Sequence, residues 1–200
     1  MKKLFFAIAA VAAITTGANA QKKAAAVAAA PTNWTLDASH SSIKFAVSHL
    51  MISETEGKFS KFDGTVSSPT ATDFEGAKVD FTIDVTSVNT DSEGRDQHLQ
   101  KEDFFDSAKF PKMTFASKSF KKVKDKNYML EGDFTMHGVT KKIKIPVRFN
   151  GITKDPYGNT KAGFKAQFVI DRTAYGMKGS TPAVGKEVSV TLNVELAQVK

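Results

Sequence analysis

The sequence of 200 residues contains no cysteine. Disulfide bonds are therefore excluded as a source of stability, and so is the lipid-modified cysteine that anchors a bacterial lipoprotein. A hydrophobic core must hold the fold together. The first 20 residues are expected to be a leader, as argued below, which leaves about 180 residues. A chain of that length buries roughly 70% of its unfolded surface in one domain. We therefore expect a single domain.

Several motifs of catalysis and cofactor binding are also missing. The chain has no Gly-x-Ser-x-Gly nucleophile turn, no glycine-rich phosphate loop, no His-x-x-x-His pair and no calcium-binding loop. Among the four histidines, His40 lies near Asp37 and Ser41, but adjacent side chains on a strand point to opposite faces and do not form a triad. We expect no metal, no cofactor and no catalytic residue, so the protein is predicted not to be an enzyme.

Acidic residues are in the minority, with 21 against 28 lysines and arginines. Without Lys2 and Lys3 the net charge falls from +7 to +5. An excess of this size favours an anionic head group or transient contact with a membrane surface, although lysines beside strands also protect sheet edges from aggregation. Nucleic acid is not an expected partner, because none of the usual aromatic and basic motifs is present.

The first 32 residues carry a targeting pattern and a low-complexity segment. Two lysines precede an apolar run from Leu4 to Ile14, and a small-x-small cleavage pattern ends at Ala20. This arrangement predicts a signal peptide at residues 1–20 and export to the periplasm, since the run is shorter than the ~20 residues that cross a bilayer. Residues 21–32 are interpreted as an alanine-rich flexible tether, and residues 33–200 as the folded domain.

Period-two alternation of apolar and polar residues dominates the rest of the chain. Clear runs occur at residues 43–48, 78–85, 128–136, 142–149, 164–170 and 187–194, and weaker ones at 33–36, 55–59, 62–67 and 113–120. The pattern predicts eight to ten strands, and the short connections favour antiparallel neighbours. Among the predicted turns are Asp63-Gly64 and Asn150-Gly151.

One segment interrupts the alternation, from Thr90 to Pro111. Thr90 and Glu93 have the spacing of a capping box, and residues 95–101 are compatible with a short helix. Phe104 and Phe105 follow, and we expect them to dock over one end of the fold. A second long loop, at residues 176–185, is expected at a rim.

Strands with a single apolar face and no helical layer to cover it must curl into a barrel or pair with another sheet. We expect an all-β fold: a single antiparallel, lipocalin-like β-barrel of about eight strands with one short covering helix. The chain has sixteen phenylalanines beside one tryptophan and three tyrosines. Phenylalanine has no polar group, so such an interior suits either a hydrocarbon ligand or an ordinary filled core, and the pattern alone does not choose.

Separate blocks of the sequence resemble, in the same order, the YceI-like family of bacterial periplasmic proteins. They are Trp34 to Met51, Gly57 to Phe59, Val85 to Asn89, Arg95 to Leu99, Phe104 to Asp106, Phe110-Pro111, Gly132 to Thr135, Gly138 to Lys141 and Asp171 to Gly176. The resemblance spans about residues 33–196. It implies a barrel whose apolar tunnel holds a polyisoprenoid or isoprenoid-quinone-like chain, without a catalytic cycle.

This resemblance makes a carrier of an isoprenoid lipid the expected function and assigns two sets of residues to it. Apolar side chains of the strands are expected to wall the tunnel: Phe45, Val47, Phe59, Phe81, Ile83, Phe115, Phe134, Ile145, Val147, Phe168, Val190 and Leu192. A polar or anionic head group is expected at the mouth, where the candidates are His40, His49, Arg95, His98 and Arg172.

Two other functions stay open from the residues alone. A filled core would make the protein a non-catalytic, stress-related interaction module, and a histidine-dependent enzyme acting on an apolar substrate is the third candidate. A solid interior without a continuous void would exclude the carrier. The sequence does not decide between a monomer and a homodimer.

Overall fold

The computed structural model describes residues 30–200, so the predicted signal peptide and nearly all of the predicted tether lie outside the described part. Eleven strand segments form one sheet. The strands are β1 (Thr32–Leu36), β2 (Ser42–His49), β3 (Ser53–Phe59), β4 (Phe62–Ser68), β5 (Lys78–Asp84), β6 (Val88–Asn89), β7 (Lys112–Lys124), β8 (Asn127–Met136), β9 (Val139–Lys154), β10 (Thr160–Asp171) and β11 (Val184–Gln198). The helices are α1 (Glu93–Leu99) and the 3-10 helices η1 (Ala38–His40), η2 (Val85–Ser87) and η3 (Arg172–Tyr175).

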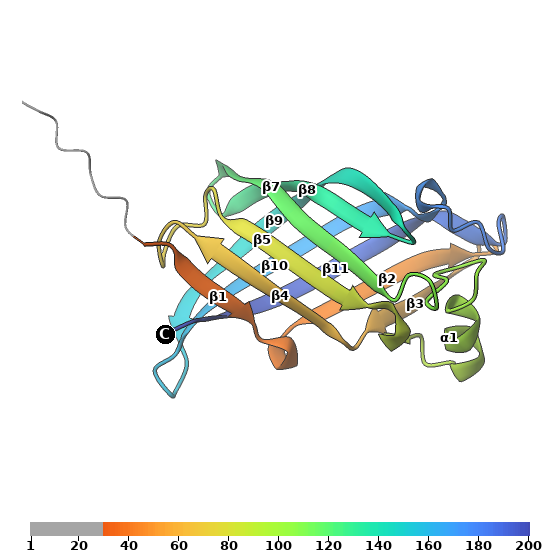
Figure 1. Cartoon of the computed structure of the whole chain (residues 1–200), viewed down its shortest axis with the longest axis horizontal. Coiled ribbons are helices and arrows are strands. Elements are labelled where there is room, and N and C mark those ends of the chain that lie inside the picture. The colour runs from red at the N-terminus through yellow and green to blue at the C-terminus, as the bar shows by residue number, and fades with distance from the viewer. Residues whose placement is uncertain (1–29) are drawn as a thin grey trace, which may run out of the picture.

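The eleven segments make eight long strands, because three strands are interrupted. β1 and β2 both pair with β11 and are successive halves of one strand. The next strand consists of β3, which pairs with β2, and β4, which pairs with β1. The one after it consists of β5, which pairs with β4, and β6, which pairs with β3. β7 to β11 continue as an antiparallel meander, and β11 closes the ring on β1 and β2 (Figure 1). The predicted antiparallel eight-stranded barrel is confirmed.

Two of the three interruptions, between β1 and β2 and between β5 and β6, have a shared sequence cause, which also acts at the end of β10. Asp37, Asp84 and Asp171 each stand two residues before a serine or threonine, and each Oδ1 accepts a hydrogen bond from that residue's backbone N–H, at 3.2, 2.9 and 2.9 Å. This Asx turn starts a 3-10 helix in all three places. Two of them bend a strand without ending it, which lets long strands wrap the barrel.

The barrel has two different ends. The helix end carries the β2–β3 turn, the segment 90–111 with α1, the β8–β9 turn and the loop 172–183. The terminal end carries the start of β1, the loop 69–77 and the end of β11. In Figure 1 α1 lies at the right of the barrel and the C-terminus at the left.

Aromatic side chains fill the interior at the terminal end. Phe74 reaches in from the loop 69–77 and is completely buried. Its ring centroid lies 5.3 Å from that of Trp34, 5.5 Å from that of Phe149 and 4.8 Å from that of Phe164. The indole N–H of Trp34 donates to Ser68 Oγ at 2.9 Å, so this large ring is buried with its polar atom satisfied.

At the helix end Phe104 and Phe105 are buried after α1, as expected of the covering segment. The predicted capping box is wrong in detail, because Ser92 is the N-cap and the helix starts at Glu93 rather than near residue 95. Asp96, one turn further on, accepts from the N–H and the hydroxyl of Thr90 at 2.8 and 2.6 Å. Among the described residues, no helix is long and apolar enough to cross a membrane.

Two predicted turns are wrong, because they lie inside strands. Asp63 and Gly64 belong to β4, where Gly64 pairs with Phe81 of β5. Asn150 and Gly151 belong to β9, and there Asn150 is the extra residue of a β-bulge. Asp-Gly and Asn-Gly therefore mark local irregularity here without reversing the chain.

Candidate functional site

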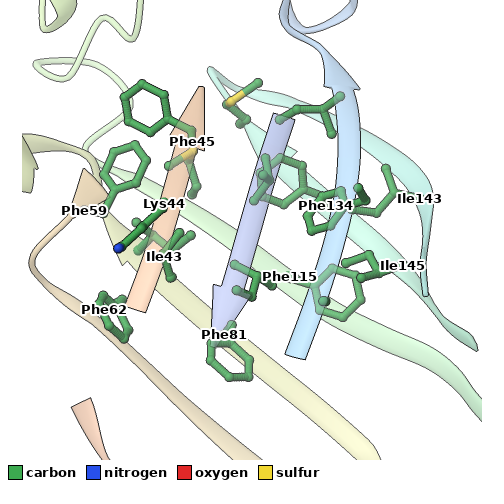
Figure 2. A pocket seen from close by; sticks show the side chains of 18 of the residues that line it. Ile43, Lys44, Phe45, Phe59, Phe62, Phe81, Phe115, Phe134, Ile143 and Ile145 are labelled. Carbon is green, nitrogen blue, oxygen red and sulfur yellow. The ribbon is translucent and has the colours of Figure 1, made fainter. Parts of the chain in front are cut away.

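A cavity extends through the barrel from the aromatic cluster at the terminal end to Phe104 and Phe105 at the helix end. Within this cavity, the centre of a sphere the size of a water molecule can move through a volume of about 210 Å³. One water needs only about 10–15 Å³ on this measure, so the interior is hollow. All lining residues are apolar except Lys44, Lys165 and Arg172. Figure 2 shows phenylalanine and isoleucine side chains gathered around this bore.

The bore is long and narrow. Its lining positions on β11 run from Val184 to Leu196. At about 3.3 Å per residue and a strand tilt of about 40°, they span roughly 30 Å along the barrel axis. Spread over that length, the volume gives a bore radius of about 3 Å once the ~1.4 Å radius of the sphere is added. Carbon contact distances give a hydrocarbon chain a radius of about 2 Å, so one extended chain fits and two do not.

The exposure of the lining side chains shows where the free space lies. Phe45, Phe168 and Val190 line the bore from β2, β10 and β11, yet they are only half-buried. Val66 and Phe115 line it from β4 and β7 and are buried. Because a side chain directed inward is accessible mainly to internal space, half-burial marks where that space is. Phe81 of β5 and Phe134 of β8 also line the bore and are half-buried, so we expect a bound chain to contact these side chains as well as Phe45, Phe168 and Val190.

Glycines on the inner face hold phenylalanine rings back against the wall. Phe45 pairs with Gly57 across β2 and β3, and Phe81 pairs with Gly64 across β4 and β5. A Cβ atom on Gly57 would overlap the Phe45 ring, and one on Gly64 would lie 2.9 Å from the Phe81 ring. Gly132 receives a third ring in the same way. A ring that lies over a glycine does not project into the bore, so these pairs help to keep it open.

All twelve residues predicted for the tunnel wall line this bore, although their contact with a ligand stays a prediction. They lie on eight segments of the sheet, and on each segment alternation alone could select them. They are Phe45, Val47, Phe59, Phe81, Ile83, Phe115, Phe134, Ile145, Val147, Phe168, Val190 and Leu192.

The five residues predicted for the mouth do not come together. His49 ends β2 and is exposed. Arg95 on α1 donates from Nε to Thr90 Oγ1 at 2.7 Å, and His98 Nε2 lies 3.1 Å from Asp103 Oδ2. These three residues are at the helix end but do not line the bore.

Arg172 is the one mouth candidate that lines the bore, and it is 4% exposed. Its guanidinium donates to the carbonyls of Gly185, Met177 and Val184 at 2.8, 3.0 and 2.7 Å, and to Thr181 Oγ1 at 3.2 Å. Burial lowers the pKa of Arg172. No carboxylate of the described residues forms an ion pair with it. Arg172 therefore binds η3 to the start of β11, and most of its donors are already used.

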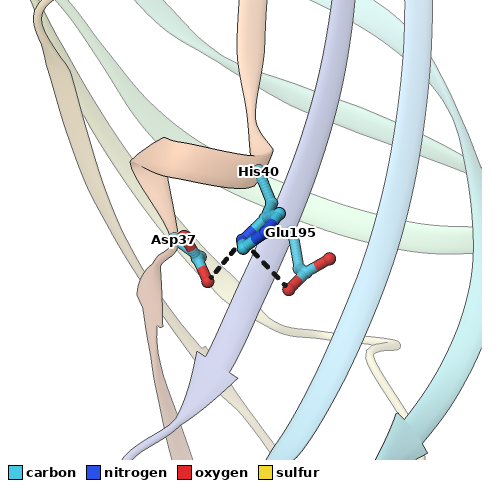
Figure 3. A group of neighbouring side chains, drawn as sticks. All are labelled: Asp37, His40 and Glu195. Atoms are coloured by element: carbon cyan, nitrogen blue, oxygen red, sulfur yellow. Dashed lines mark hydrogen bonds and ion pairs between the residues drawn. The ribbon is translucent and has the colours of Figure 1, made fainter. Parts of the chain in front are cut away.

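His40 lies at the seam where the first and last strands close the barrel (Figure 3). Its Nδ1 is 3.1 Å from Asp37 Oδ2. Lys161 Nζ lies 2.6 Å from the same Asp37 oxygen and 3.4 Å from Glu195 Oε1. Hydrogen bonds from Lys161 and Ser39 hold the pKa of Asp37 well below its usual range, and Asp37 raises the pKa of Lys161. This seam cluster joins β10 and β11 to the β1–β2 junction.

The seam cluster has the geometry of a structural contact. Ser39 Oγ and Asp37 Oδ2 both lie 3.1 Å from Nδ1 of His40, whereas a proton relay needs one partner on each ring nitrogen. Asp37, His40 and Glu195 have donor atoms within 4.8 Å of one another, which is compatible with a metal ion. However, the ammonium group of Lys161 already forms an ion pair with each of the two carboxylates. The contacts of the seam cluster therefore support neither a catalytic site nor a metal site.

Asp37→Asn is expected to lower the free energy of unfolding at pH 7 by about 1–3 kcal/mol, because Lys161 loses its nearest carboxylate. The native contacts hold the pKa of Asp37 below its unfolded value near 3.9. The stabilisation is therefore present above that value and is lost as the pH falls toward the folded pKa. Urea unfolding should show the difference from wild type shrinking between about pH 5 and pH 3.

The control is Asp80→Asn, since Asp80 is an exposed residue of β5 without an ion pair among the described residues. Its unfolding free energy should stay within about 0.5 kcal/mol of wild type at about pH 5 and at about pH 3. An Asp37→Asn difference that stays constant as the pH falls would contradict the assignment of the seam cluster.

Sequence reasoning missed three kinds of contributor to this site. The glycines opposite phenylalanines become visible only when the strand register is known. Phe74 lies in a loop that shows no alternation, although an isolated phenylalanine in a polar loop indicates insertion into the core. Lys161 pairs with Asp37 across 124 residues, and no local pattern predicts a contact of that range.

Comparison with known proteins identifies the family. Residues 34–196 match the model of the YceI-like domain. A UPF0312 protein of Pseudomonas savastanoi pv. phaseolicola is 36% identical over 158 residues, which is 79% of each chain. The YceI protein of Campylobacter jejuni superposes with a TM-score of 0.69 at 31% identity, over 76% of this chain and 90% of that one. A polyisoprenoid binding domain from Saccharophagus degradans shares the fold, with a TM-score of 0.66 at 16% identity over 83% of this chain and 98% of that one. This chain therefore belongs to the YceI-like domain family.

Proposed function

We propose that this protein binds and carries a long isoprenoid lipid, of the polyprenyl or isoprenoid-quinone type, in the bore of its barrel. The observation that carries the proposal is the apolar bore of about 210 Å³, which is wide enough for one hydrocarbon chain. The fold that this chain shares with a polyisoprenoid binding domain supports the same ligand class.

The length of the bore favours a long tail over an ordinary acyl chain. The apolar core of a bilayer is about 30 Å thick, so one phospholipid tail reaches about half of that. The bore is roughly as long as the whole apolar core. A single acyl chain would leave much of it empty, whereas a lipid with several prenyl units would fill it.

Burial of apolar surface drives this binding, at about 25 cal/mol per Å² before the costs of association are subtracted. The wall offers few polar partners, so the tail is held by many weak contacts and without directed bonds. We expect the head group at the helix end, because the aromatic cluster around Phe74 fills the terminal end.

The proposal is a binding role without chemistry on the ligand. The histidines that lie near hydroxyls or acids are outside the bore. Residues 1–20 have the pattern of a signal peptide, which supports a place of action in the periplasm. A carrier in that compartment would shield an insoluble lipid from water between membranes.

Val190→Trp tests this function directly. Val190 lines the bore between Phe45 of β2 and Phe168 of β10, so an indole there occupies the space of the ligand. We expect the lipid retained per protein molecule to fall at least about tenfold, because the tryptophan side chain, which buries about 150–250 Å² of surface, would cover wall that the lipid otherwise contacts. Native mass spectrometry of protein from cells measures occupancy and subunit number, and solvent extraction identifies the lipid.

Ser189→Trp is the matched control, because Ser189 is next to Val190 in β11 but is exposed on the outer face. It should retain the wild-type amount of lipid. Wild-type protein that carries no isoprenoid, or a Val190→Trp variant that carries as much as wild type, would contradict the proposed function.

A further inference from the structure

Three large apolar residues form the turn between β2 and β3, and nothing in the described part of the chain covers them. Leu50, Met51 and Ile52 are 54%, 86% and 85% exposed. Single exposed apolar residues are common on protein surfaces, but three in succession at the tip of a hairpin are not explained by packing. We call these three residues the apolar tip.

The backbone of the turn makes this composition costly. The Ile52 N–H donates to the His49 carbonyl at 3.2 Å, and the two central residues, Leu50 and Met51, have φ of 52° and 61°. His49 pairs with Ser53, so three residues connect the two strands, and the four-residue turn from His49 to Ile52 has the positive φ values of type I′ at both central positions, for which Asn-Gly is favoured. Bulky side chains are strained in that conformation. Folding alone would therefore favour other residues here, so the apolar tip needs another reason.

The apolar tip lies beside the end of the bore where we expect the head group. The Leu50 N–H donates to the Ala183 carbonyl at 2.7 Å, which joins the tip to the loop 172–183. Arg172, Met177 and Val184, within or next to that loop, line the bore. A surface that holds the tip would therefore also face the helix end of the bore.

The surroundings of the tip suit an apolar environment. Apart from His49, residues 45–53 and 179–185 contain no acidic or basic residue. The α1 side of the same end is different, since residues 90–106 contain six acidic and two basic residues. Insertion of the tip would thus bury no permanent charge, whereas the α1 side would stay in water.

We propose that the apolar tip inserts into the surface of a phospholipid bilayer and places the helix end of the barrel against the membrane. The inference concerns the outside of the barrel and does not depend on a lipid in the bore. Three side chains are far fewer than the roughly 20–30 residues that each partner of a stable protein interface contributes. A fluid bilayer accepts a small convex apolar surface without a complementary shape, which makes it the favoured partner.

Tryptophan reporters test the insertion site by site. Trp34 is the only native tryptophan and is 1% exposed, so its emission should not respond to vesicles. Met51→Trp places a reporter at the tip, and Tyr157→Trp places one at the terminal end, where Tyr157 is 87% exposed. The probe is vesicles of phosphatidylethanolamine and phosphatidylglycerol. We expect a blue shift and quenching by brominated lipid for Met51→Trp, and neither change for Tyr157→Trp.

A turn replacement separates membrane contact from a structural role. Leu50→Asn combined with Met51→Gly supplies the favoured turn, so it should fold at least as well as wild type while its vesicle affinity falls at least about tenfold. Wild type and variants are purified from cells that express the full chain. Mass spectrometry verifies that the compared proteins have the same N-terminus. Cosedimentation measures the affinity.

Three results would overturn the proposal. One is a turn variant that binds vesicles as tightly as wild type. The second is vesicle binding without an emission change in Met51→Trp. The third is an emission change that follows protein concentration without vesicles, because a second copy would then cover the tip. None of these results depends on whether Val190→Trp loses lipid, so the two proposals fail separately.

Discussion

Arg172→Met is expected to lower the free energy of unfolding by about 3–5 kcal/mol, because it removes the donor to three carbonyl groups at a buried loop. Arg172 holds the carbonyls of Met177, Val184 and Gly185 together, and each oxygen loses this partner in the variant. Methionine has a similar length and lines an apolar bore well, so lost packing contributes little. Urea unfolding followed by far-UV circular dichroism measures the change.

Two further variants show whether hydrogen bonds cause the effect. Arg172→Lys keeps the charge and three donors but loses the planar fork, so its unfolding free energy should lie between those of Arg172→Met and wild type. Arg148→Met removes an exposed arginine of β9 and should change the unfolding free energy by less than about 0.5 kcal/mol. A stability of Arg172→Met close to wild type would show that the carbonyls find other partners.

The same loss should loosen the helix end. The guanidinium carbon of Arg172 lies 5.8 Å from the ring centroid of Phe104, so Arg172 also contacts the segment that covers the bore. Hydrogen exchange in Arg172→Met should therefore accelerate in residues 172–186 and 100–106 more than in β7 or β8. Uniform acceleration across the barrel would indicate global destabilisation without a local role of Arg172.

The barrel wall could be predicted from sequence because it depends only on which face of a strand a residue occupies. Phe81 and Ile83 alternate with polar neighbours, and this parity is kept in any register of the sheet. The same argument placed Phe168 and Val190 inside, although they lie on different strands. Whether the enclosed volume stays empty depends on ring orientation, which parity does not determine, and for that the family resemblance was needed.

Contacts between distant segments could not be predicted in the same way. His40 was expected at the mouth, but the Asx turn at Asp37 places it on the barrel seam, near Glu195 and Lys161. Arg172 was expected to meet a head group, and most of its donors bind backbone carbonyls instead. Carbonyl groups have no sequence signature, so the partners of a buried arginine are known only once the loop is folded.

Gly57→Ala is expected to reduce the lipid content at least about tenfold, which is a larger change than a single methyl group normally produces. A Cβ atom on Gly57 would overlap the Phe45 ring and lie 2.8 Å from Thr90 Cγ2. The Phe45 ring must then rotate away from the wall, and the bore is the free space beside it. Overpacking of this kind costs about 1–3 kcal/mol, so most of the protein should stay folded.

Gly163→Ala is the matched control, because the nearest atom to its added Cβ is 3.6 Å away on Asn150. This is ordinary van der Waals contact, so the lipid content should equal that of wild type. The measurement is again native mass spectrometry of protein from cells. A Gly57→Ala variant with the wild-type lipid content would show that the Phe45 ring has another place to go.

A second-site change tests the cause. Adding Phe45→Leu to Gly57→Ala replaces the ring with a shorter side chain that leaves room for the new methyl group, so the lipid content should recover. Phe45→Leu alone should change the content little, because it widens the bore without blocking it. Recovery in the double variant would tie the open bore to the contact between one glycine and one ring. Without recovery, the loss in Gly57→Ala would have to come from displacement of Thr90 and the covering segment that follows it.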